Sequence, residues 1–308
     1  MILEDETDLS LEYLMAILSS ELINNFFRAC FVDNHIATQY LEAIPIFNPT
    51  VGIEESEAEM NQAWKLFKQS DVVSADISPV KNAGIDSKIQ FALTTLTKNI
   101  GELANRRNSL NLDIKDYIRN YAEGQPLPEI GFSQPPKDSA DSILHETTET
   151  RDKLQIERAE VERESPNTVT IHLTARYKPE DEEDHDLDQY GYAETDFRPA
   201  LRITDLTETE ADLVEAFVPV AVEEAGGFAG FRDNATKTNS LIDRLKKLTL
   251  PAVDDVRDGL ENYIETKERA EELDEKIERT DDLIDQIVYE LYGLTDEEIE
   301  IVENAVGE

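Results

Sequence analysis

The sequence predicts an α+β protein that is predominantly helical, with two long heptad helices flanking a small mixed α+β section. Apolar residues recur in alternating three- and four-residue steps over 85–121 and 253–292, as in coiled-coil-like helices. Between them, apolar and polar residues alternate over 169–177, which indicates a strand with one buried face. We therefore expect four segments: a module over 1–50, a helical spacer over 51–130, an α+β head over 131–250, and a C-terminal helical segment over 251–308.

The two heptad helices need a partner for their apolar seams. The simplest arrangement pairs them as a stalk that carries the α+β section as a head. Heptads require a partner without identifying it, so an equal alternative is that each helix packs on a globular core of its own.

Shorter elements follow from local signals. Leu11, Leu14, Leu18 and Leu22 predict an amphipathic helix with Asp8 as its N-cap. Thr207 with Glu210, and Thr295 with Glu298, have the spacing of capping boxes that begin helices. We further expect a strand over 40–46, helices over 57–70, 149–164 and 231–249, a linker over 133–148, and an extended run that ends at 204 and forms a hairpin with 169–177.

The charge is strongly acidic, with 68 Asp and Glu against 29 Lys and Arg and a net charge of −39. The acids are spread through patterned segments rather than gathered in one tail. Their repulsion strains the compact state in dilute buffer, but at 1 M salt the Debye length falls to about 3 Å and screens most of it. We therefore expect an acidic surface of the halophilic (haloarchaeal) type and a cytoplasmic location, since the N-terminal residues MILEDETD are acidic where a signal peptide is basic.

Sequence motifs for catalysis, cofactors and metals are absent. There is no glycine-rich dinucleotide fingerprint, phosphate loop, HExxH motif or triad spacing, and Cys30 is the single cysteine. Pro135-Pro136 lies between Gln134 and Lys137, so it lacks the Asn/Asp-Pro-Pro-aromatic pattern of amino-methyltransferases. We expect no catalytic, cofactor-binding or metal-binding residues in this chain.

One window, residues 232–247, is basic and contains five basic residues and two acidic ones. Its cations attract phosphates, and its amides and hydroxyls suit phosphates or base edges. The alternative is a helix whose lysines pair with neighbouring acids. The candidate DNA-binding residues are Arg232, Lys237, Asn239, Arg244, Lys246 and Lys247.

Two stretches resemble a known family. Residues 11–20 (LEYLMAILSS), Phe26-Phe27-Arg28 and residues 40–46 (YLEAIPI) resemble the TaqI-like C-terminal specificity domain of type II restriction–modification enzymes, in which a "yLlaiLnS" helix precedes a "yle.iPi" strand. Residues 284–299 (IDQIVYELYGLTDEEI) resemble the "iD..vYeLYgLteeEi" tail of many adenine-specific methyltransferase–specificity polypeptides. Together the two stretches cover about 60 residues near the two ends of the chain.

The resemblance implies DNA sequence recognition for an adenine N6-methyltransferase or a fused endonuclease. The chain departs from the family pattern because its first residues already lie inside the recognition region. We therefore expect the adenine pocket and the S-adenosylmethionine site on a separate catalytic subunit or domain. The expected function is the specificity and scaffold part of a restriction–modification methyltransferase that binds double-stranded DNA. The alternative is a helical interaction protein without a DNA role, which forms homo-oligomers through its heptad helices.

Overall fold

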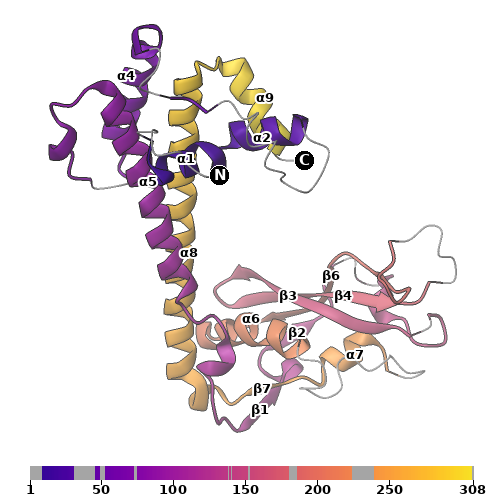
Figure 1. Cartoon of the computed structure of the whole chain (residues 1–308). Coiled ribbons are helices and arrows are strands. Elements are labelled where there is room, and N and C mark those ends of the chain that lie inside the picture. The colour runs from indigo at the N-terminus through magenta and orange to yellow at the C-terminus, as the bar shows by residue number, and fades with distance from the viewer. Residues whose placement is uncertain are drawn as a thin grey trace. The chain divides into compact units, whose positions relative to one another are not determined.

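The computed structural model describes residues 9–30, 46–48, 53–72, 75–137, 139, 141–151, 153–179, 186–223 and 239–306. The fold is α+β and predominantly helical, as predicted, and the chain divides into two compact units (Figure 1). Unit 1 comprises residues 1–110 and 267–308, and unit 2 comprises residues 111–266. The first and last of the four predicted segments thus contribute to the same unit.

Unit 1 is helical. Its core is formed by α1, α4 and α5 together with the last part of α8, and α5 packs against both α1 and α4. The predicted first helix is two helices in the structure, because Ser20 is extended and separates them. Ser10 is the N-cap of the first, since its hydroxyl accepts a hydrogen bond from the Tyr13 N–H, while Asp8 lies outside the described residues. The helices are α1 Leu11–Ser19, α2 Glu21–Cys30, α4 Ile53–Gln69, α5 Ile85–Asn108, α8 Val253–Tyr292 and α9 Asp296–Val306.

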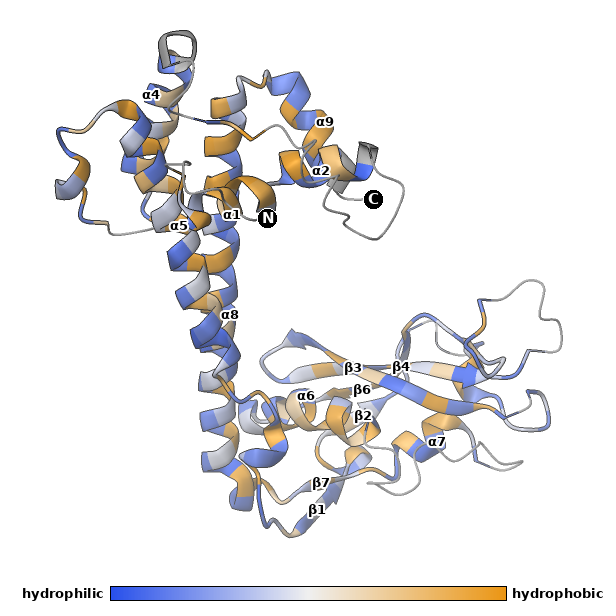
Figure 2. Cartoon of the chain, in the orientation of Figure 1, coloured by the Kyte–Doolittle hydropathy of each residue, from blue (hydrophilic) through white to orange (hydrophobic). Residues whose placement is uncertain are grey.

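The two predicted heptad helices correspond to α5 and α8. They contact each other in unit 1 through an Arg107–Asp274 ion pair at 3.0 Å and a 3.5 Å hydrogen bond from Asn99 to Thr280. The two ends of α8, by contrast, are buried in two separate cores, with Leu260 in that of unit 2. Figure 2 shows the residues between those ends as mostly hydrophilic. Both predicted arrangements therefore hold in part: the helices touch, and α8 also packs on globular cores.

The predicted helix over 85–121 ends early, at Asn108. Ile114 and Tyr121, which continue the heptad spacing, instead belong to unit 2, where Ile114 is buried in the core and Tyr121 packs against it. Asp113 caps a short 3-10 turn there by accepting a hydrogen bond from the Lys115 N–H. The apolar spacing was correct, but the later residues belong to a different core.

Unit 2 contains a five-stranded antiparallel sheet in the order β2-β6-β4-β3, with β5 paired to β4, and a two-stranded pair β1-β7. The predicted strand over 169–177 and its hairpin partner are confirmed as β4 and β6. Helix α6 packs on β3 and β4, and the core lies between them. The elements are β1 Glu123–Pro126, β2 Phe132–Gln134, β3 Gln155–Ser165, β4 Thr168–Tyr177, β5 Ala193–Glu194, β6 Arg198–Thr204, α6 Glu208–Glu223, α7 Leu241–Leu245 and β7 Thr249–Pro251.

Three predictions in this region are wrong. Most of the predicted charged helix over 149–164 is instead strand β3, which begins at Gln155, because pairing with β4 outweighs the helix propensity of its Glu and Arg residues. In the described part of the predicted helix over 231–249, the chain forms the short α7 followed by β7, since Leu248 and Leu250 are buried as the chain pairs with β1. The linker over 133–148 contains the end of β2, which pairs with β6. Residues 231–238 and 40–45 lie outside the described part of the chain.

The local capping signals are confirmed. The Thr207 hydroxyl accepts from the Glu210 N–H while Glu210 accepts from the Thr207 N–H, so α6 begins at a capping box. The same reciprocal pair at Thr295 and Glu298 precedes α9. Gly293 has a φ of 64° after α8, the left-handed conformation that favours glycine at a helix end.

Candidate nucleic-acid interface

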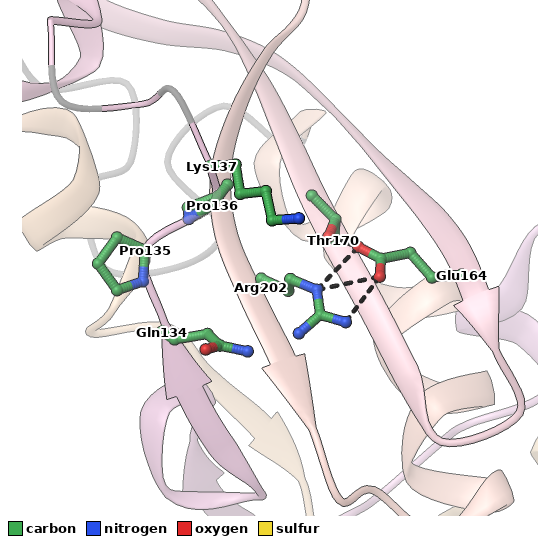
Figure 3. A pocket seen from close by; sticks show the side chains of 7 residues that line it. All are labelled: Gln134, Pro135, Pro136, Lys137, Glu164, Thr170 and Arg202. Atoms are coloured by element: carbon green, nitrogen blue, oxygen red, sulfur yellow. Dashed lines mark hydrogen bonds and ion pairs between the residues drawn. The ribbon is translucent and has the colours of Figure 1, made fainter.

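Basic and hydrogen-bonding side chains gather at the end of β2, an edge strand of the five-stranded sheet (Figure 3). They line an open hollow of about 490 Å³. Its residues come from the end of β2, from the chain just after it, and from strands β3, β4 and β6. They are Gln134, Pro135, Pro136, Lys137, Glu164, Thr170 and Arg202.

The strand register places three of these side chains in one row across the sheet. Gln134 on β2 lies opposite Arg202 on β6, and Arg202 lies opposite Thr170 on β4. Directly paired residues of neighbouring strands project to the same face, so the row is a consequence of the pairing. Gly131 permits the close approach of β2 to β6, since a Cβ there would lie 2.5 Å from the carbonyl oxygen of Thr204.

An ion pair holds the Arg202 guanidinium in place. Its Nε donates to both carboxylate oxygens of Glu164 at 3.0 Å, and its Nη2 donates to Oε2 at 2.8 Å. The hydroxyl of Thr170, which is buried, donates to Glu164 Oε1 at 2.5 Å. These hydrogen bonds from Arg202 and Thr170 lower the pKa of Glu164, and the hydrogen bond to Glu164 raises the pKa of Arg202.

A second, smaller hollow of about 120 Å³ shares Gln134 and Pro135 with the first. Lys246, at the C-terminal end of α7, lines it together with His145. Lys137, Arg202 and Lys246 are therefore distributed over two adjoining hollows. Of the described residues that line these hollows, Glu164 alone carries a carboxylate. In a chain with more than twice as many acids as bases, this is a locally basic surface.

The predicted DNA-binding residues fall in different places. Lys246 is exposed and belongs to the smaller hollow. The Lys247 amine donates to the Asn239 side-chain oxygen at 3.1 Å, so these two predicted residues contact each other. Arg244 is half-buried on α7. Arg232 and Lys237 lie outside the described residues.

Arg202, Gln134 and Glu164 are not among the site residues predicted from the sequence. Two features of the sequence concern their neighbours in the hollow. The alternation over 169–177 predicts a polar face that includes Thr170, and Lys137 directly follows the Pro-Pro pair. Register pairing with β6 and β2 then decides which residues join Thr170 on that face, and register between distant strands cannot be read from spacing.

The same sheet carries a second threonine–glutamate–arginine group. The buried hydroxyl of Thr174 donates to Glu194 Oε1 at 2.6 Å, and the Nε of Arg158 donates to the same atom at 2.7 Å. The guanidinium of Arg158 lies over the Phe197 ring, 5.4 Å from its centroid. This group lies outside both hollows and therefore offers an internal comparison for Arg202.

In unit 1, the described parts of the two stretches that resemble specificity polypeptides contribute to one core, through residues 13–17 and 284–291. Residues 40–45 of the first stretch lie outside the described residues. Asp285 of the second stretch accepts a hydrogen bond from the Glu21 N–H, just after the first stretch, at 2.8 Å. The Tyr13 hydroxyl donates to the Phe47 carbonyl oxygen and the Phe47 N–H donates to the Tyr292 hydroxyl, both at 2.8 Å. Glu21 also accepts a hydrogen bond from the Tyr289 hydroxyl, so residues 264 and 268 positions apart in the sequence are hydrogen-bonded in unit 1.

The fold and this surface define a two-unit, mainly helical α+β protein whose five-stranded sheet is basic and rich in hydrogen-bonding groups at one edge. No family model, curated protein or solved structure matches the chain. Within the described residues, no three His, Cys, Asp or Glu side chains are grouped so as to hold a metal ion. None of the described helices has the length and apolar character needed to cross a membrane.

Proposed function

We propose that the chain is the DNA sequence-recognition and scaffold part of a restriction–modification adenine-specific DNA methyltransferase. Catalysis and S-adenosylmethionine belong to a partner subunit or domain, in a cytoplasm of high salt. The observation that carries the proposal is that the described parts of the two resembling stretches pack in one core of unit 1. If both stretches derive from one such specificity polypeptide, we expect them to pack together in a single module despite their separation in the sequence.

The surface at the end of β2 supports the recognition role. Lys137 and Lys246 supply positive charge, while the side chains of Gln134 and Arg202 supply directional hydrogen bonds. At molar salt, counterion release adds little to binding, so contacts to phosphates contribute weakly. Recognition by so acidic a protein must therefore rest mainly on base edges and DNA shape, which need few cations.

The alternative, a helical oligomerisation protein, has less support. It requires that the apolar residues of the heptad seams are exposed and available to pack against a second chain. Within the described residues, many seam positions are already buried inside one chain, including Leu96, Leu103, Leu273 and Ile287. Little seam surface then remains for a partner helix.

Selection from a library of randomised duplex DNA tests the proposal. The full chain is mixed with the methyltransferase encoded by the neighbouring reading frame, and DNA retained in molar KCl is sequenced. We expect one enriched motif, and we expect the pair to methylate adenine within it. Retention of DNA without any sequence preference would contradict the proposal.

Charge reversal at the predicted residues provides the second arm. Arg244→Glu, Lys246→Glu and Lys247→Glu should each weaken retention across all sequences and reduce the salt slope by about 1 per lost phosphate contact. Lys276→Glu, an exposed lysine on α8, makes the same charge change as a control. If the control weakens binding as much as Lys246→Glu, the effect reflects net charge and not this surface.

A further inference from the structure

Arg202 is held in a single orientation before any ligand arrives. Glu164 accepts hydrogen bonds from its Nε and Nη2, and the buried hydroxyl of Thr170 donates a hydrogen bond to Glu164. A guanidinium that is already oriented loses little side-chain entropy on binding. Figure 3 shows the remaining nitrogen, Nη1, pointing to the Gln134 side, away from Glu164. Among the described residues, no hydrogen bond joins Nη1 to an acceptor.

The charge of the pair also matters. Glu164 offsets the positive charge of Arg202, so the pair attracts a phosphate weakly, especially at high salt. The donor geometry of the guanidinium is unaffected by that offset. What remains is a set of directional N–H groups that suits a neutral acceptor edge better than an anion. Lys137 lines the same hollow, where its charge acts on Glu164, and it adds a cation that attracts the DNA backbone.

We propose that Arg202 reads the acceptor edge of a guanine in duplex DNA, with Glu164 and Thr170 as its positioning residues. Guanine presents two acceptors, N7 and O6, in the major groove, and arginine donors match that pattern. Gln134 lies on β2 directly opposite Arg202, and its side-chain amide offers both a donor and an acceptor to the same or the adjacent base pair. The inference rests on the proposed function and deepens it by naming a base and a reader.

The test compares motifs selected by the wild-type complex and by variants from the same duplex library. Arg202→Lys keeps the charge and the stem but loses the planar fork. We expect preference for guanine at one position to fall about 5- to 100-fold while the other positions keep theirs. The slope of affinity against salt should not change. Arg202→Ala should give the same result if circular dichroism shows that it folds, and Arg202→Lys decides if it does not.

The positioning role has its own readout. Glu164→Gln keeps an acceptor but loses the charge-assisted bidentate pair, and Thr170→Val removes the hydroxyl that fixes Glu164. Both should weaken preference at the position that Arg202→Lys weakens, and at no other. A residue that only stabilises the sheet would lower affinity for every sequence equally.

Arg158→Lys is the matched control, because Arg158 belongs to the same kind of threonine–glutamate–arginine group outside the hollow. It should leave the motif unchanged, and an equal loss there would overturn the assignment. Uniform weakening with a shallower salt slope in Arg202→Lys would overturn it in favour of a phosphate contact. An unchanged motif would make the ion pair structural and leave the proposed function standing. If the wild-type complex selects no motif, both proposals fail.

Discussion

Asp285 Oδ1 accepts a 2.8 Å hydrogen bond from the backbone N–H of Glu21, the first residue of α2. The first N–H groups of a helix have no partner within it, so a residue 264 positions away in the sequence caps α2. Asp285 is only 8% exposed and faces the acidic side chains of Glu21, Asp281 and Asp282. Burial, the largest cause, raises its pKa to about 7 even though the hydrogen bond opposes the shift.

This carboxyl predicts a pH-dependent stability. Its pKa in the folded state lies above the unfolded value of 3.8, so the folded state binds the extra proton. The stabilising contribution is fully present below the unfolded pKa and is lost as the pH rises through about 7. Asp285→Asn keeps an Oδ1 acceptor but cannot ionise. As the pH rises through this window, the free energy of unfolding of Asp285→Asn should increase relative to that of the wild type by up to about 1.4 kcal/mol per pH unit.

Urea unfolding at several pH values between 4 and 8 measures the difference. Glu272→Gln, an exposed carboxylate on α8, serves as the control and should show no such trend. A constant difference between Asp285→Asn and the wild type over this range would contradict the prediction.

Tyr292 and Tyr13 hold the segment around Phe47 from its two backbone groups. Tyr292→Phe removes the acceptor of the Phe47 N–H, a donor in a partly buried position. We expect a loss of about 1–3 kcal/mol in the free energy of unfolding, the cost of an unsatisfied buried group. Tyr190→Phe removes a hydroxyl from a residue that is 66% exposed and should change stability little. Equal effects in thermal unfolding would show that the Phe47 contact does not stabilise the fold.

Two helical glycines should respond to alanine with opposite signs. At Gly259 in α8, a Cβ would lie 2.3 Å from the backbone oxygen of Tyr117, so either the helix or the chain at Tyr117 must move. We expect Gly259→Ala to destabilise unit 2 by more than about 2 kcal/mol. At Gly101 in α5, the described residues leave the space open, and alanine should stabilise the helix by about 0.5–1 kcal/mol. Differential scanning calorimetry measures both shifts.

The net charge of −39 predicts strong stabilisation by salt. Screening shortens the Debye length from about 10 Å at 0.1 M to about 3 Å at 1 M and removes most of the repulsion between surface carboxylates. We expect Tm to rise on the order of 10 °C over that range, which corresponds to about 3 kcal/mol in a chain of this size. Glycine betaine, a zwitterion that does not screen, controls for effects of excluded solutes. An equal rise in betaine would mean that repulsion between carboxylates is not what limits stability.

Local signals in the sequence were sufficient for several elements. Apolar periodicity predicted α8, alternation predicted β4, and the reciprocal pairs Thr207–Glu210 and Thr295–Glu298 marked the starts of α6 and α9. Each of these signals depends on residues within one or two turns, or within one strand, so the sequence contains the whole interaction.

The tertiary structure decided the rest. Residues 155–165 became a strand because β4 lies beside them, and Ile114 left the heptad of α5 because another core buries it. The candidate interface depends on register, since Gln134, Arg202 and Thr170 form a row only when β2, β6 and β4 pair as they do. By itself the sequence determined the charge, the helices with internal periodicity and their caps. Which distant residues meet was decided by long-range packing and strand pairing, because those energies depend on partners that no local spacing specifies.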